Sequence, residues 1–159
     1  MFHYGTQSKH PCLIAAVTAW PSEHVEAIHM TFLNYDGEKI DHEKNKLRRG
    51  SCPYGAVRLG KPSKKLYLAE GIETALSVIQ ITGDPCWAVL SATSFKPFHP
   101  PESVKEILIA ADNDCAGTNN AKIAASHFSR LGFKAYITTP DETGADFNDF
   151  LNKGVGSYV

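Results

Sequence analysis

The sequence of 159 residues contains no long hydrophobic run. Its longest apolar stretches, such as residues 12–17 and 107–111, are far shorter than the roughly 20 residues that cross a bilayer, which excludes a membrane-spanning helix. The first residues also lack the apolar segment of a secretory signal peptide. We therefore expect a cytoplasmic protein with no membrane partner.

Paired cysteines are missing as well. The four cysteines are spread singly along the chain, with no CxxC pair, and the seven histidines show no recognised metal spacing. This pattern argues against a structural zinc site and against a thioredoxin-like redox motif. Buried, reduced thiols are the expected state of Cys12, Cys52, Cys86 and Cys115.

A strong net charge is also absent, because 16 Lys and Arg nearly balance 17 Asp and Glu. The charge is unevenly distributed, however. Residues 39–65, here called the basic arm, contain nine basic residues and two acids, a net charge of +7, so the other residues sum to −8. Such polarity suits a protein that holds phosphates with one part and divalent cations with another, although a solvated loop explains the arm equally well.

Length and composition predict one compact globular domain, or one domain with a small appendage. The chain is 43% hydrophobic and 21% charged, with a mean hydropathy of −0.22. Residues 1–62 are interpreted as a β-rich, basic N-terminal subdomain. Its predicted elements are strands at 12–20, 25–33 and 54–59 and a hairpin-type turn at 34–37.

Beyond residue 62 strand-like and helix-like segments alternate, which predicts a mostly parallel sheet with helices on both faces. Residues 63–159 are accordingly interpreted as a separate α/β catalytic domain. The expected strands are 66–69, 87–90, 107–111 and 133–138, and the expected helices are 72–81, 119–131 and 147–152. Gly83 and Gly132 are expected to end the first two helices.

Acidic residues follow two of these strands, where an open α/β sheet binds its ligands. Glu70 ends the first strand, and Asp112 and Asp114 follow the strand at 107–111. Residues two apart in an extended chain project to the same side, so these two aspartates can hold one cation while the residue between them points away. Carboxylate oxygens suit Mg²⁺ or Mn²⁺. Isolated, such a pair is more often only a turn.

A further acidic pair, Asp146 and Asp149, lies near the last predicted helix. Both residues are candidate metal ligands. An equally weighted alternative is that Asp146 caps the helix and Asp149 is a first-turn acid favoured by the helix dipole.

Together these segments resemble the Toprim domain. The resemblance rests on Leu68-Ala69-Glu70-Gly71-Ile72-Glu73-Thr74-Ala75-Leu76, then Ile109-Ala110-Ala111-Asp112-Asn113-Asp114, then Ala145-Asp146-Phe147-Asn148-Asp149. More closely, they are similar to the Toprim domains of plasmid and phage primases and primase-helicases. Residues 55–60 and the preceding β unit resemble the segment that leads into Toprim in those proteins, so the likeness covers most of the chain from Pro11.

The resemblance implies a four-stranded, mostly parallel sheet flanked by helices and preceded by a small antiparallel β unit. It implies that Glu70 is the general acid/base, that Asp112 and Asp114 hold Mg²⁺, and that Asp146 and Asp149 are further metal ligands. The implied activity is nucleotidyl transfer that makes RNA primers on single-stranded DNA in the replication of a plasmid, phage or mobile element.

The implied partners are single-stranded DNA and nucleotides, with a helicase or zinc-binding module in the same or another chain. The sequence has neither the cysteine spacing of a zinc module nor the length of a helicase, and no topoisomerase module with a strand-attacking tyrosine. A small metal-dependent Toprim nuclease and a non-catalytic nucleic-acid-binding remnant therefore stay as alternatives. The expected contacts to nucleic acid or nucleotides are the basic residues Lys44, Lys46, Arg48, Arg49 and Arg58.

Overall fold

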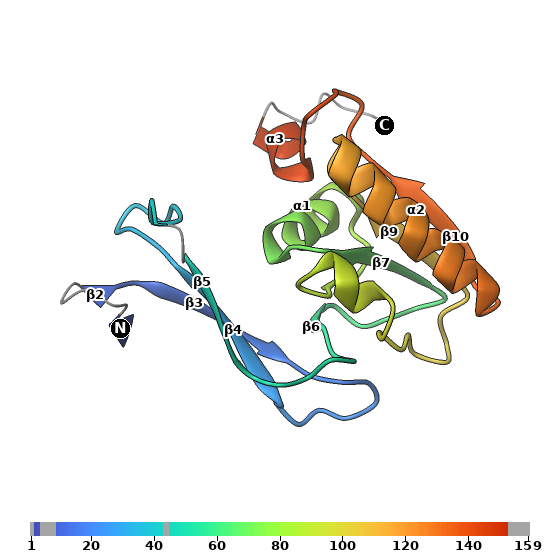
Figure 1. Ribbon diagram of the computed structural model, residues 1–159, viewed down its shortest axis with the longest axis horizontal. Helices are drawn as coiled ribbons and strands as arrows, with labels where there is room; N and C mark the ends of the chain where they lie inside the picture. Colours follow the sequence, from blue (N-terminus) through green and yellow to red (C-terminus); the bar gives the residue numbers. More distant parts are fainter. Residues whose placement is uncertain (1, 4–8, 43–44, 153–159) are drawn as a thin grey trace. The chain divides into compact units, whose positions relative to one another are not determined.

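The computed structural model describes residues 2–3, 9–42 and 45–152 (Figure 1). The chain forms two compact units, residues 1–52 and 53–159. Each unit is described separately, beginning with the N-terminal one.

The first unit contains the antiparallel β structure expected from the sequence. A two-stranded sheet pairs β1 (Phe2–His3) with β2 (Lys9–His10). A three-stranded antiparallel sheet has the order β3-β4-β5, where β3 is Cys12–Val17, β4 is Ala27–Phe32 and β5 is Lys46–Gly50. The predicted turn at 34–37 is present, with Gly37 at a φ of 88° and the Asn34 side chain accepting from two backbone N–H groups.

Strand β5 lies in the basic arm and was not predicted. Its sequence is charged rather than apolar, and it is a strand because it pairs along β4 from Lys46 opposite Thr31 to Gly50 opposite Ala27. Gly50 has a φ of 89°, and a Cβ at this position would collide with the carbonyl of Glu26. Pairing with β4, and not the local sequence, therefore makes this segment a strand.

The second unit is built on a five-stranded sheet with the order β10-β9-β7-β8-β6. The expected four-stranded parallel sheet is confirmed, since β10, β9, β7 and β8 all pair in parallel. The segment predicted at 54–59 adds β6 as an antiparallel edge strand. The bounds are β6 Val57–Leu59, β7 Lys65–Ala69, β8 Cys86–Ala88, β9 Glu106–Ala110 and β10 Lys134–Thr138.

Both faces of this sheet are covered. Alternate residues of β7 and β9, led by Leu68 and Ile109, form a buried core with α2 (Cys115–Arg130) and with Phe95 in the 3₁₀ helix η1 (Ala92–Phe95). The opposite face packs against α1 (Ile72–Thr82), and the short α3 (Phe147–Asn152) contacts α1 (Figure 1). No helix within the described ranges is long and apolar enough to cross a membrane.

The helix ends follow local capping chemistry. Gly83 ends α1 in the left-handed conformation, with a φ of 73°, as expected. Helix α2 was expected from residue 119 and begins four residues earlier, at Cys115. The reason is that Asp114 Oδ1 accepts the N–H of Gly117 at 2.6 Å and so caps the helix, which makes Cys115, Ala116 and Gly117 part of its first turn.

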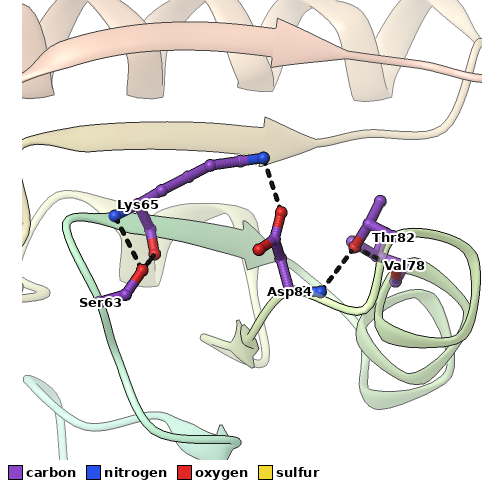
Figure 2. Close-up of polar contacts among 5 residues, drawn as sticks. All are labelled: Ser63, Lys65, Val78, Thr82 and Asp84. Atoms are coloured by element: carbon purple, nitrogen blue, oxygen red, sulfur yellow. Dashed lines mark hydrogen bonds and ion pairs between the residues drawn. The ribbon is translucent and has the colours of Figure 1, made fainter.

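A polar network fixes the start of β7, at the end of the sheet away from Glu70. Lys65 Nζ lies 2.6 Å from Asp84 Oδ2, and the N–H of Asp84 donates to Thr82 Oγ1 at 3.1 Å (Figure 2). The hydrogen bond to Asp84 raises the pKa of Lys65. This network joins β7 to the α1–β8 connection, and because the pair is partly exposed its contribution is at most about 1 kcal/mol.

Candidate active site

The acidic residues meet where the strand order reverses. From β7 the chain crosses to β8 on one side, and β9 then pairs with β7 on its other side. Ligands of open α/β sheets bind at such a switch point, beyond the carboxyl ends of the strands. Ala69 lies opposite Ala110 in the parallel register, so Glu70 and Asp112 leave adjacent strands at the same edge.

The main chain of Glu70 is held by the connection that follows β8. Its carbonyl accepts the N–H of Leu90 at 2.9 Å, and its side chain is exposed. Leu90 has a φ of 71°, which a non-glycine residue rarely adopts. Sequence reasoning missed Leu90, because nothing in an Ala-Val-Leu-Ser segment indicates a left-handed residue. The strained backbone beside Glu70 is consistent with a functional edge.

The turn after β9 places Asp112 and Asp114 differently. The carboxylate of Asp112 forms no hydrogen bond within the described part of the chain, whereas Asp114 uses one oxygen to cap α2. A Cβ on Gly117 would lie 2.5 Å from the carbonyl oxygen of Asp112, so the helix approaches this turn more closely than a side chain permits. The glycine therefore lets α2 start directly behind Asp112.

The later acidic pair forms a reciprocal cap on α3. Asp146 Oδ1 accepts the N–H of Asp149 at 2.7 Å, and Asp149 Oδ2 accepts the N–H of Asp146 at 3.3 Å. This arrangement confirms the capping interpretation. Each carboxylate keeps a second oxygen that forms no hydrogen bond among the described residues, so a cap and a metal ligand are compatible roles.

Asn113 joins the two acidic segments, and sequence reasoning missed this role. Its Nδ2 donates to the carbonyls of Pro140 at 2.9 Å and Glu142 at 3.1 Å. Its backbone N–H donates to Ala145 at 3.0 Å, and its carbonyl accepts from Gly144 at 2.7 Å. The residue between the two aspartates points away from them, as expected, and binds the loop that leads to Asp146.

The charge distribution shows that five carboxylates gather at this edge. Burial is the largest cause of a raised pKa at Asp112, followed by repulsion from Asp146, Asp114, Glu70 and Asp149 in that order. The charged groups that raise the pKa of Asp112 are all acidic, so negative charge is concentrated at this edge. Within the described ranges no three His, Cys, Asp or Glu side chains are placed to hold one ion together.

The basic residues selected from the sequence lie in both units. Lys46 and Arg48 are two apart on β5 and share one face, and Arg49 lies on the other face. Arg48 Nη2 donates to the carbonyl of Cys52 at 2.7 Å. Arg58, in the second unit, lies 5.7 Å from the ring centre of Trp87, its neighbour across β6 and β8. Lys44 lies outside the described residues.

Comparison with known families identifies the second unit. A family model described as a Toprim domain matches residues 65–155. The chain belongs to the Toprim domain family. A second model, described as a domain of unknown function (DUF7146), matches residues 2–59. The boundary between the two matches lies close to the boundary between the compact units.

Solved primase structures share the fold of this Toprim protein. The primase fragment of the bacteriophage T7 primase-helicase has a TM-score of 0.62 at 18% identity, over 90% of this chain and 59% of that chain. A DNA primase domain from Pseudomonas aeruginosa has a TM-score of 0.53 at 14% identity, over 88% and 53%. The Aquifex aeolicus primase, with its zinc binding and RNA polymerase domains, has a TM-score of 0.59 at 15% identity, over 82% and 34%.

The chain thus spans between about a third and three fifths of the length of these primase structures. Its aligned share of 90% against the phage protein exceeds residues 53–159 alone, so the likeness includes residues of the β-rich N-terminal unit. At these identities the likeness shows the fold.

Proposed function

We propose that this Toprim protein is a primase-like nucleotidyltransferase that makes RNA primers on single-stranded DNA. The observation that carries the proposal is the group of five carboxylates around Asp112, at the switch point of a fold shared with primase domains. Primer synthesis during replication of a plasmid, phage or mobile element is the specific setting proposed, and the cytoplasm is the compartment where its DNA and nucleotide substrates occur.

The proposed cofactor is Mg²⁺, or Mn²⁺ in its place. The chemistry of the donors fits, because carboxylate oxygens are the ligands these ions prefer and the acids around Asp112 repel one another. Asp112 and Asp114 would hold the ion, with Asp146 and Asp149 as further ligands. When bound, the ion would neutralise charge on the phosphates of the substrate.

Glu70 is the proposed general acid/base. In primer extension the 3′-hydroxyl of one ribonucleotide attacks the α-phosphorus of a ribonucleoside triphosphate, a new P–O bond forms, and the bond to pyrophosphate breaks. A carboxylate at the position of Glu70 can take the proton that the attacking hydroxyl loses. Its exposed side chain and the hydrogen bond that holds its main chain suit this role.

The basic arm is proposed to hold phosphates of the template or nucleotide. Lys46 and Arg48 share a strand face, Arg49 extends the charge to the opposite face, and Lys44 and Arg58 complete the proposed set. A helicase or zinc-binding module in the same or another chain is the proposed partner. This is supported by one similar structure that comes from a primase-helicase and by another that carries a zinc binding domain.

One assay tests the proposal. The chain is incubated with circular single-stranded DNA, labelled ribonucleotides and Mn²⁺, and the products are separated by length. We expect template-dependent labelled oligoribonucleotides that disappear in the Asp112→Asn/Asp114→Asn variant. Shortened DNA without labelled products indicates a nuclease instead. If DNA is bound but neither product forms, even with a zinc-binding module added in trans, the chain acts as a binding protein.

A further inference from the structure

A groove of about 610 Å³ lies between η1 and the second half of α2. Its floor is apolar and includes Phe95 and Ala124, both buried. Its other lining residues include Lys96, Lys122 and Arg130. The groove is distinct from the carboxylate site, since Asp114 caps the opposite end of α2. Arg130 follows Asp114 by 16 positions, about 24 Å along a helix.

The charge of the groove is one-sided. Three cations line it, and no Asp or Glu does. Arg130 donates to Ser126 Oγ at 3.1 Å, and within the described ranges no carboxylate forms an ion pair with Lys96, Lys122 or Arg130. The dipole of α2 explains a cation in its last turn, such as Arg130. It does not explain Lys122 in mid-helix or Lys96 on the facing element.

Two side chains of the groove are in unfavourable surroundings, one apolar and exposed to water, the other polar and without a hydrogen-bond partner among the described residues. Ile123 is 71% exposed, although burial of such an apolar side chain is favourable. His127 Nε2 is shielded from water and has no hydrogen-bond partner within the described residues. An occupant with apolar side chains would bury Ile123, and its acceptor oxygens could reach His127 Nε2 only if the side chains that shield this atom moved.

We propose that this groove binds an acidic amphipathic helix of a partner protein. The apolar face of that helix would cover Ile123 and the floor, and its Asp or Glu side chains would pair with Lys96 and Lys122. The residues of α2 that line the groove run from 120 to 130, about 15 Å, which matches roughly three turns of a docked helix.

Single-stranded nucleic acid is the less suitable occupant. It binds by stacking bases on exposed aromatic rings, and the phenyl ring that lines this groove, Phe95, is only 4% exposed. The helix would lie along the body of α2 and leave the carboxylates beyond its N-terminus uncovered. The proposal is therefore independent of the chemistry assigned to Glu70.

The test uses the full chain and a labelled helical peptide of about 15 residues, with leucines at helical spacing and glutamates between them. The matched control peptide has lysine in place of each glutamate. Binding is followed by fluorescence anisotropy, and the binding surface by amide chemical shifts in NMR. We expect saturable binding of the acidic peptide alone, with shifts gathered at residues 92–96 and 120–130.

Substitutions test whether the acidic peptide binds in the groove. Lys96→Glu/Lys122→Glu should weaken binding of the acidic peptide at least about tenfold, because it reverses the complementary charge. Ile123→Ser should also weaken binding of the acidic peptide, because it removes the proposed apolar contact. Lys64→Glu/Lys105→Glu changes two lysines outside the groove and should bind as the parent does.

Three results would overturn the proposal. The first is the absence of shifts in the groove at millimolar peptide. The second is equal binding of the lysine peptide, which would show a contact without charge complementarity. The third is binding of an oligothymidylate at the same amides by a chain that ignores the acidic peptide, which would assign the groove to nucleic acid.

Discussion

The side chain of Asn113 donates from Nδ2 to the carbonyl of Pro140 at 2.9 Å, across 27 residues of sequence. This contact connects the turn after β9 to the loop after β10. Since the same loop continues to Asp146, Asn113 sets the distance between the two acidic segments. The geometry of the proposed metal site thus depends on a residue that need not touch the metal.

Replacing Asn113 should weaken the metal site. Asn113→Ala removes the bonds to Pro140 and Glu142 and leaves the part-buried carbonyl of Pro140 without this donor, whereas the exposed carbonyl of Glu142 can bind water, so we expect a loss of about 1 kcal/mol. We expect a lower melting temperature and a lower Mn²⁺ affinity in titration calorimetry. Asn119→Ala, at an exposed helix position, is the matched control. Unchanged Mn²⁺ affinity in Asn113→Ala would show that the loop is positioned by other contacts.

Much of the fold can be read from the sequence, because its signals are local. The apolar run 107–111 and the acids that follow it predict a strand that ends at a site, and Gly83 predicts the end of α1. Strand β5 was not predicted, because its charged composition does not indicate a strand and only pairing with β4 makes it one. The role of Asn113 was also not predicted, because its partners lie 27 and 29 residues away and only the folded chain brings them together.

Gly117 should be intolerant of a side chain. In Gly117→Ala the added Cβ would lie 2.5 Å from the carbonyl oxygen of Asp112, so the turn or the helix must move. We expect destabilisation of roughly 1 to 3 kcal/mol in urea unfolding, together with weaker Mn²⁺ binding. Gly71→Ala is the control, since its Cβ meets nothing closer than 3.4 Å. Equal stability of the two variants would contradict the close approach.

Asp112 should destabilise the metal-free chain at neutral pH. Its raised pKa means that the folded chain holds this proton more tightly than the unfolded chain does. The stability from that proton is complete below the ordinary pKa of 3.8 and is lost as the pH rises through the raised value. Asp112→Asn should therefore be more stable than the parent at pH 7 without metal and melt at a higher temperature. The gain should stay below about 1 kcal/mol, because the carboxyl is only partly buried and solvent screens its charge.

The stability gain of Asp112→Asn should depend on pH. The advantage of Asp112→Asn should vanish near pH 3, where the carboxyl is neutral in both states. Asp36→Asn, in an exposed turn, serves as the comparison. An advantage that persists unchanged at pH 3 would mean that packing, and not charge, favours asparagine.

Glu70→Gln should remove catalysis and spare binding. Glutamine keeps the size of the side chain but cannot exchange a proton at neutral pH, so a loss of about 10² to 10⁴ in the extension rate is expected. Mn²⁺ affinity and DNA affinity should stay close to those of the parent. Glu73→Gln, in the first turn of α1, is the matched variant. If Glu73→Gln stops turnover and Glu70→Gln does not, the acid/base role belongs to Glu73.

The arginines of β5 should set the salt dependence of DNA binding. Each cation that contacts a single strand contributes a slope of roughly −0.7 in log affinity against log salt, so Arg48→Ala/Arg49→Ala should make the slope shallower by more than about one unit. The bond from Arg48 to Cys52 predicts in addition that Arg48→Ala alone lowers stability, whereas Arg49→Ala does not. Lys105→Ala/Lys134→Ala removes the same amount of positive charge and controls for net charge. These lysines lie where β9 and β10 begin, at the opposite end of the strands from Glu70. Fluorescence anisotropy across a salt series distinguishes phosphate contact from a solvated strand, because the latter leaves the slope of the arginine variant equal to that of the parent.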